Sequence, residues 1–137
     1  MLREIVERAY TVYVERIGRR PAPMDDDYDA KVHSGEVFVA DDGAVVGLIV
    51  LVEQPDHLLV ENVAVDPVRQ GAGIGRALLA YAEEHALARG LGELRLYTNE
   101  AMTENLSFYP RLGYREVGRH VEDGFRRVYY SKRLSAP

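Results

Sequence analysis

Residues 58–90 read LLVENVAVDPVRQGAGIGRALLAYAEEHALARG, and this stretch decides how the rest of the chain is interpreted. Its first part, up to Val65, is almost continuously apolar, which is typical of a strand buried on both faces. An Asp-Pro pair ends that run, and a glycine-rich turn follows at 70–76. Residues 77–89 have helical composition and stop at Gly90, a residue type that commonly follows the last helical turn. The stretch therefore predicts a strand, a turn and a helix in succession.

Three glycines, Gly71, Gly73 and Gly75, stand at alternate positions before this helix. Backbone without side chains approaches a ligand closely, and the first N–H groups of a helix have no partner within it, so such a turn attracts phosphate. It is not a Walker loop, because Arg76 and Ala77 stand where that loop needs Lys and Ser or Thr. It also lacks the third glycine of the G-x-G-x-x-G dinucleotide fingerprint, since Arg76 holds that position.

The turn instead fits the pattern Q-x-x-G-x-G, with Gln70, Gly73 and Gly75 directly after the apolar residues 62–65. This combination resembles the coenzyme A pyrophosphate loop of the GCN5-related N-acetyltransferases, the GNAT family. Downstream, the segment Phe108-Tyr109-x-x-Leu112-Gly113-Tyr114 is similar to the family's tyrosine helix and the start of its next strand. Together these motifs extend the resemblance over roughly residues 35–134.

The resemblance implies an α/β fold of the acyl-coenzyme A N-acyltransferase type. In that fold a mixed, mostly antiparallel sheet is splayed between two parallel strands and flanked by helices. The apolar pattern is consistent with it and predicts helices at 2–17, from Asp25 through about His33, at 73–89 and at 104–111, and strands at 36–40, 44–52, 58–65, 93–98, 114–121 and 125–134. Asp-Gly pairs predict tight hairpins after the first and the fifth strand.

Length and composition narrow the class of protein. The 137 residues suit one domain, so we expect a single N-acetyltransferase domain over 1–137. The chain has no long apolar span or signal peptide, and we expect a cytoplasmic protein without membrane contact. The absence of cysteine excludes thiolate metal sites and a cysteine nucleophile, and we expect no metal. A net charge of −5 argues against a nucleic-acid partner and mildly favours a cationic acceptor such as an amine.

The resemblance also implies which residues bind acetyl-coenzyme A as co-substrate. Backbone N–H groups of the turn would hold the diphosphate, with Arg76 as an extra charge, and the backbone of the central strand would pair with the pantetheine arm. The residues expected to bind the coenzyme are Val63, Ala64, Val65, Gln70, Gly71, Ala72, Gly73, Ile74, Gly75, Arg76 and Asn105. The family's usual Asn-x-x-Ala-x-x-x-Tyr pattern is broken, because Met102 stands seven residues before Tyr109. Whether Asn105 or Asn99 takes the place of that asparagine is left open.

Two residues are the catalytic candidates. Tyr109 matches the family's tyrosine, whose hydroxyl protonates the departing sulfur of coenzyme A, and a purely packing tyrosine is the alternative. Glu61 interrupts an apolar strand, which is costly unless its carboxylate faces a wet cleft or a partner, so it is the favoured general base. Tyr97 or a water molecule is the alternative base, and a structural hydrogen-bonding role for Glu61 is the alternative to catalysis.

The acceptor side is expected to include Met24, Tyr28, Tyr97 and Asn99, and half-buried packing on the second helix is the alternative for Met24 and Tyr28. The acceptor itself is left open among small-molecule amines, antibiotics, polyamines and protein amino groups, because such contacts lie on variable elements. A homodimer is allowed by analogy. The leading hypothesis is an N-acetyltransferase acting on a primary amine by direct attack. The alternative is a non-catalytic acyl-coenzyme A sensor or interaction domain of the same fold, which would have no reason to hold a hydroxyl at Tyr109.

Overall fold

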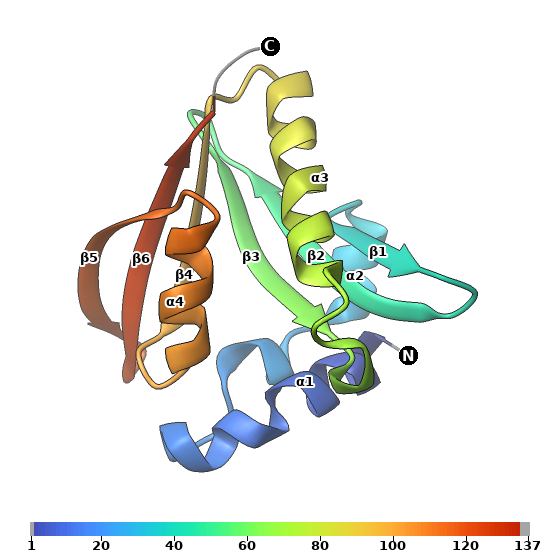
Figure 1. Ribbon diagram of the computed structural model, residues 1–137, viewed down its shortest axis with the longest axis vertical. Helices are drawn as coiled ribbons and strands as arrows, with labels where there is room; N and C mark the ends of the chain where they lie inside the picture. The colour runs from blue at the N-terminus through green and yellow to red at the C-terminus, as the bar shows by residue number, and fades with distance from the viewer. Residues whose placement is uncertain (1, 135–137) are drawn as a thin grey trace.

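The computed structural model describes residues 2–134, which form a six-stranded mixed sheet with helices on both faces (Figure 1). The elements in chain order are α1 (Leu2–Ile17), the 3-10 turn η1 (Ala22–Asp25), α2 (Tyr28–His33), β1 (Val37–Asp41), β2 (Val45–Glu53), β3 (Leu58–Val65), the 3-10 turn η2 (Pro67–Arg69), α3 (Ile74–Ala88), β4 (Glu93–Asn99), α4 (Thr103–Arg111), β5 (Arg115–Glu122) and β6 (Phe125–Arg133). The strand order is β1-β2-β3-β4-β6-β5, and β3 and β4 are parallel while the other described pairs are antiparallel. None of the helices within this range combines the length and apolar character needed to cross a membrane.

The predicted order and type of the main elements are confirmed, and one helix differs in detail. The segment expected as a single helix from Asp25 to His33 is divided into η1 and α2. Asp27 causes the division, because it has extended backbone geometry and its carboxylate accepts the N–H of Ala30 at 3.1 Å, which caps α2. The predicted hairpin between the last two strands turns through Asp123 and Gly124, both with positive φ, as a two-residue type I′ turn requires.

A bulge in β3 sends its side chains to different faces of the sheet. Val50 of β2 pairs with Asn62, and Leu51 pairs with Val60, so Glu61 is an extra residue without a partner. An extra residue turns every side chain that follows it to the opposite face. The expectation that the strand is buried on both faces is therefore too simple: four of its residues are buried, and they alternate with four that are only half buried.

Two apolar clusters lie on the two faces of the sheet. One joins α3 and α4 to the sheet, with Leu79, Leu94 and Tyr130 among its most buried members. The other joins α1, η1 and α2 to β2 and β3, with Ile5 and Met24 nearly fully buried. The bulge in β3 allows this one strand to supply side chains to both clusters.

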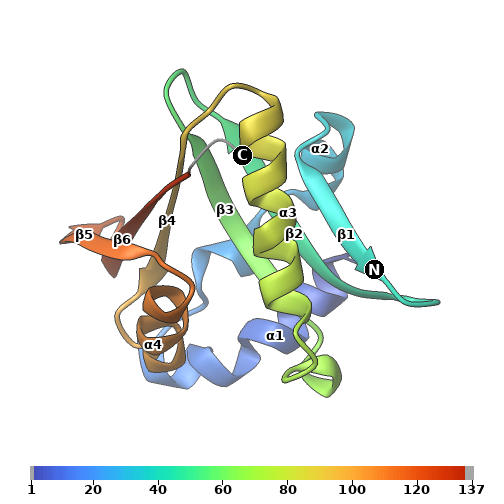
Figure 2. The ribbon, with the colours of Figure 1, turned by 45° about the horizontal axis from the view of Figure 1, so that its top comes forward.

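β3 and β4 separate along their length. They pair only at Leu58–Val60 with Leu94–Leu96, and beyond this point each strand continues without the other. Figures 1 and 2 both show the two strands diverging from that narrow end, with α1 running beneath the wide end of the wedge. β2 still pairs with the separated part of β3, and β6 with that of β4, so the sheet remains connected on both sides of the wedge.

Candidate active site

A cavity of about 780 Å³ occupies the wedge between β3 and β4. Its wall is built from β3, the glycine turn, the start of α3, β4, α4, α1 and the closing hairpin. Most of the predicted site residues line it: Glu61, Val63, Ala64, Val65, Gln70, Gly71, Gly73, Ile74, Gly75, Arg76, Tyr97, Asn99, Asn105 and Tyr109. The splayed strands thus bring predicted residues that lie up to 48 positions apart, from Glu61 to Tyr109, to one cavity.

Three predicted residues do not line the cavity. Ala72 is exposed in the turn, and its N–H bonds to the Arg69 carbonyl at 3.3 Å. Met24 and Tyr28, expected on the acceptor side, are 1% and 3% exposed and belong to the apolar cluster under α1. They do not wall the pocket as expected, because the bulge turns the far half of β3 toward them and they pack behind the cavity wall.

Tyr28 nevertheless touches the wall through Asn62. The Asn62 amide donates to the Tyr28 hydroxyl at 2.9 Å, and that hydroxyl donates to the Pro23 carbonyl at 2.5 Å. On the other side, the Tyr10 hydroxyl lies 2.5 Å from Asn62 Oδ1 and 3.2 Å from the Val63 carbonyl oxygen. Burial raises the pKa of Tyr10, so it stays a neutral donor. This buried chain of hydrogen bonds fixes the far half of β3 against α1 and η1.

The start of α3 presents backbone N–H groups to the cavity. The first intrahelical bond runs from Ala77 N to the Gly73 carbonyl at 3.0 Å, and Gly73, as the N-cap, offers no side chain. The amides of Ile74, Gly75 and Arg76 therefore have no carbonyl partner within residues 2–134. Gly73 has φ +82°, a left-handed conformation that other residues adopt at a cost. The geometry matches what an anion-binding helix start requires.

Basic side chains from η2, the first turn of α3 and α4 line the cavity. Arg69, Arg76 and Arg111 all line the cavity, and Arg111 was not predicted from the sequence. Arg69 is paired with Asp42 of the β1–β2 hairpin. The free amides and the Arg76 side chain favour an anion at this end of the cavity.

The glycine turn is also tied to α1. Asp66, which precedes η2, accepts a hydrogen bond from Arg8 at 2.8 Å and one from Val68 N at 3.3 Å. The bond from Arg8 lowers the pKa of the Asp66 carboxyl. The turn is thereby anchored on its α1 side before it enters α3.

Tyr109 lies on α4 with its ring in the core and its residue surface 8% exposed. Tyr114 and Tyr130 pack against the ring, with centroids 5.6 and 5.7 Å away. Burial raises the pKa of Tyr109, and the nearby Tyr130 and Tyr13 raise it further. Within residues 2–134, the Tyr114 hydroxyl is the one fully buried side-chain oxygen that lacks a hydrogen-bond partner. The Tyr109 hydroxyl is therefore either accessible to solvent or hydrogen-bonded. Because its pKa is raised, Tyr109 borders the cavity as a neutral phenol.

Glu61 is the bulged residue and lines the cavity just beyond the last β3–β4 pair. Its carboxylate forms an ion pair with Lys31 of α2, and the two side chains are 24% and 18% exposed. Burial lowers the pKa of Lys31, but the hydrogen bond and charge of Glu61 outweigh this and raise it. Sequence reasoning found Glu61 but not its partner, because no local pattern links residues 31 and 61.

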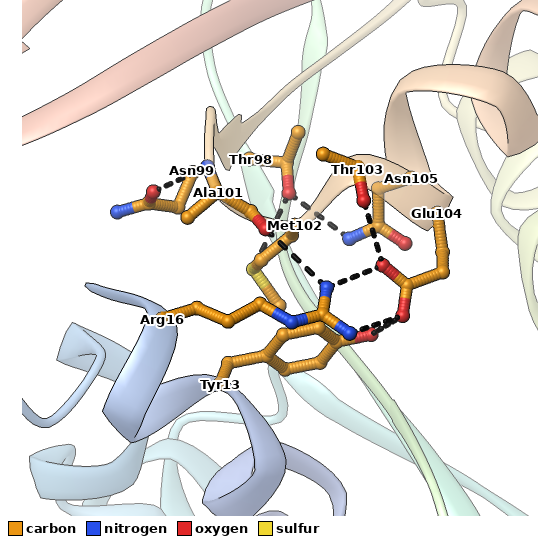
Figure 3. Close-up of polar contacts among 9 residues, drawn as sticks. All are labelled: Tyr13, Arg16, Thr98, Asn99, Ala101, Met102, Thr103, Glu104 and Asn105. Carbon is orange, nitrogen blue, oxygen red and sulfur yellow. Dashed lines mark hydrogen bonds and ion pairs between the residues drawn. The ribbon is translucent and has the colours of Figure 1, made fainter.

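The two candidate asparagines are each partly engaged (Figure 3). Asn105 Nδ2 donates to Thr98 Oγ1 at 3.0 Å, and its side-chain oxygen has no hydrogen bond in this cluster. Asn99 Oδ1 accepts the N–H of Ala101 at 2.9 Å and shapes the loop before α4. Both residues line the cavity, so the structure does not separate their roles.

A clasp made by Tyr13, Arg16 and Glu104 joins α1 to α4 (Figure 3). Arg16 donates to both carboxylate oxygens of Glu104, at 2.6 and 3.1 Å, and lies 5.0 Å from the Tyr13 ring centroid. The Tyr13 hydroxyl reaches the same carboxylate at 3.4 Å. Tyr13 and Glu104 line the cavity. The sequence offered no indication of this contact, because it joins residues 88 positions apart.

Comparison with known proteins provides independent evidence about the family of this chain. The model of the acetyltransferase (GNAT) family matches residues 1–114. The protein named Uncharacterized protein YxbD of Bacillus subtilis (strain 168) is 34% identical over 88 residues, which are 64% of this chain and 54% of YxbD. The chain thus spans about half the length of this curated relative.

Solved structures show the same fold. The crystal structure of nourseothricin acetyltransferase is 31% identical, with a TM-score of 0.67 over 72% of this chain and 65% of that one. A GNAT family acetyltransferase from Elizabethkingia anophelis, solved with acetyl-coenzyme A bound, is 22% identical, with a TM-score of 0.68 over 82% of this chain and 85% of that one.

Among residues 2–134 no three His, Asp or Glu side chains are grouped as a metal site would need.

The clasp generates a prediction about titration. Hydrogen bonds from Arg16 lower the pKa of Glu104 from its ordinary value of 4.5 to about 2. Because the pKa of Glu104 is lower in the folded state, its ionised carboxylate stabilises the folded protein above about pH 4.5. This stabilisation is lost as the pH falls through about 2. In Arg16→Gln the pKa of Glu104, followed by carboxyl NMR, should rise toward its ordinary value. Arg95→Gln is the matched control, because Arg95 pairs with Glu93 and should leave Glu104 unchanged. A native Glu104 that titrates at the ordinary value would contradict the clasp.

Proposed function

The chain belongs to the acetyltransferase (GNAT) family, and from that membership we propose that it transfers an acetyl group from acetyl-coenzyme A to a primary amine. The observation that carries the proposal is the single cavity that joins the free amides of α3 to Tyr109 and Glu61. A diphosphate needs the first feature, and acyl transfer with proton exchange needs the other two.

The residues present fit the coenzyme. The N–H groups of Ile74, Gly75 and Arg76 would hold the diphosphate, and the Arg76 side chain would add a charge. A side chain at Gly73 would have nothing within 4 Å among the protein's own atoms, so it would enter the space in front of the helix start. The turn thus has a residue without a side chain at the place where a ligand would approach.

The separated part of β3 offers the second half of the coenzyme site. Val63, Ala64 and Val65 have no partner on β4, because the ladder ends at Val60. Backbone N–H and C=O groups that face no neighbouring strand can pair with an extended ligand. We assign the pantetheine arm to this edge and the oxyanion of the reaction to one of its N–H groups.

The chemistry follows from the two side chains. The amine nitrogen attacks the thioester carbonyl, a C–N bond forms and the C–S bond breaks. Glu61 takes the proton that the nitrogen loses, directly or through water, and the Tyr109 hydroxyl gives its proton to the departing sulfur. Tyr97 and Asn99, farther along the wall, border the acceptor. Met24 and Tyr28 support that wall from behind rather than touch the acceptor.

The cradle is tested with Gly73→Glu. The new carboxylate would face the diphosphate and add the strain of a left-handed backbone, so affinity for coenzyme A should fall about 100-fold or more, as loss of two charge-assisted hydrogen bonds implies. Gly90→Glu is the matched control, because Gly90 has a similar φ of +74° at the other end of α3 and lies outside the cavity. Isothermal titration calorimetry measures both. Unchanged affinity in Gly73→Glu would refute the cradle.

The acid is tested with Tyr109→Phe. Turnover, followed as free thiol released from acetyl-coenzyme A in the presence of amines, should fall by about 10²–10⁴, the usual contribution of a general acid. Coenzyme affinity should change little, since the ring stays in place. Tyr114→Phe is the control, because its hydroxyl is buried without a partner and does not line the cavity. Equal turnover in the Tyr109 variant would remove its role.

The base is tested with Glu61→Gln. The amide cannot take a proton, so the acidic limb of the pH–rate profile should disappear while coenzyme affinity stays near that of the parent protein. Glu53→Gln, an exposed change at the end of β2, should leave the profile as it is. If both variants keep the parent profile, the base is water or Tyr97.

A further inference from the structure

The acceptor half of the cavity contains a buried arginine that the proposed chemistry does not use. Arg127 lies on β6, where its Cα pairs with Asn99 of β4, and its side chain is 8% exposed. It lines the cavity. Its strand neighbour Arg126 points to the opposite face and is 79% exposed. The Arg127 charge therefore lies at the cavity wall, whereas the Arg126 charge lies largely in solvent, near Glu100.

Aromatic rings hold the Arg127 guanidinium in place. Its central carbon lies 4.4 Å from the centroid of Tyr97 and 5.7 Å from that of Phe125. Such stacking restricts the guanidinium to one plane and leaves its N–H groups at the edge free to bond. Tyr97 and Phe125 line the cavity too, so the arginine and both rings form one surface.

The ion pairing of Arg127 is incomplete. Within residues 2–134 its ion-pair partner is Glu122, 3.2 Å away, whose side chain is 56% exposed at the hairpin. Glu122 is shared, because it also accepts the Tyr129 hydroxyl at 2.6 Å. A guanidinium has five N–H donors, and one exposed, shared carboxylate compensates only part of the cost of burying it. A second anion reaching the cavity would supply the rest.

The carboxylate of Glu61, which also pairs with Lys31, lies on the strand that faces Tyr97. Glu61 and Tyr97 are the residues that directly follow the last β3–β4 pair, Val60 with Leu96. Burial raises the pKa of Tyr97; Arg127 lowers it and Glu61 raises it further, so both charges act on the same ring. An acceptor at Tyr97 thus lies between a carboxylate and a guanidinium.

We propose, on the basis of the function proposed above, that the acceptor is an amine that also carries a carboxylate, as a free amino acid does. Its amino group faces Glu61, and its carboxylate bonds the Arg127 guanidinium beside Tyr97. The pairing is of the bidentate kind that arginine forms with carboxylates. The carboxylate of the acceptor thereby accepts hydrogen bonds from the guanidinium N–H groups of Arg127 that Glu122 does not pair.

Matched acceptors test this proposal. Release of thiol from acetyl-coenzyme A is measured with the L-amino acids and with their C-terminal amides, which keep the amine and lose the carboxylate. We expect kcat/KM to be about 10- to 100-fold higher for at least one amino acid than for its amide, as charge-assisted hydrogen bonds imply. In Arg127→Gln this preference should vanish through KM, with coenzyme affinity unchanged. Arg126→Gln removes the same charge outside the cavity and should keep the preference.

A second variant covers the case in which Arg127→Gln does not fold. Glu122→Gln changes an exposed residue outside the cavity lining and alters the pairing of Arg127. It should shift KM for the amino acids severalfold and leave KM for their amides unchanged. Equal kcat/KM for acids and amides in the parent protein, or equal shifts of the two in this variant, would overturn the proposal.

A binding measurement separates this proposal from the proposed function. Calorimetry with amino acids and their amides, on the protein saturated with coenzyme A, needs no acyl transfer. Binding of an amino acid but not its amide, lost in Arg127→Gln, supports the site even if no amine is acetylated. Transfer to amides as efficient as to acids would retain the acetyltransferase and overturn only the carboxylate subsite. Failure of both binding and preference would overturn the subsite outright.

Discussion

The end of the β3–β4 ladder at Val60 and Leu96 is the constraint on which the structure depends. A parallel pair that stops after three residues leaves backbone donors and acceptors without partners on the facing edges, and buried groups of this kind are costly unless something else bonds them. The protein satisfies part of this need itself, since Tyr10 reaches the Val63 carbonyl. The rest is available to a ligand that can lie along β3 as a strand would. The wedge is therefore a site because the sheet is incomplete there.

Keeping two strands apart requires a support, and α1 provides it. Arg8 holds the glycine turn, Tyr10 holds β3, Arg16 holds α4, and Arg19 bonds the Asp123 carbonyl in the closing hairpin. The exposed ion pairs are individually weak, with typical values of about 0–1 kcal/mol. The buried chain through Asn62 matters more, because removing one partner would leave polar groups unpaired in the core. One helix and the loop after it thus set the width of the wedge from both sides.

The elements could be predicted because their determinants are local. Apolar periodicity, Asp-Gly pairs and the alternate glycines all act within a few residues, and the glycine turn occurs as expected. The bulge at Glu61 could not be predicted, because it is a property of register between two strands. The burial of Met24 and Tyr28 behind the wall agrees with the packing alternative, but no local pattern could choose between packing and the pocket wall. Gly47 was also overlooked: a Cβ there would lie 3.1 Å from the Ala64 carbonyl oxygen and 3.2 Å from Ile74, so glycine is needed for α3 to approach the sheet.

Net charge predicts less about the acceptor than the local arrangement does. The chain carries −5, which taken alone favours a cationic acceptor. Yet Arg69, Arg76, Arg111 and Arg127 all line the cavity. Charges on the outer surface are screened over about 8–10 Å at physiological salt, whereas a stacked guanidinium in the wall acts at contact distance. An acceptor bound as proposed would therefore experience the charges of Glu61 and Arg127 more strongly than the acidic exterior. A molecule with both an amine and a carboxylate matches that pair, whatever the total charge of the protein.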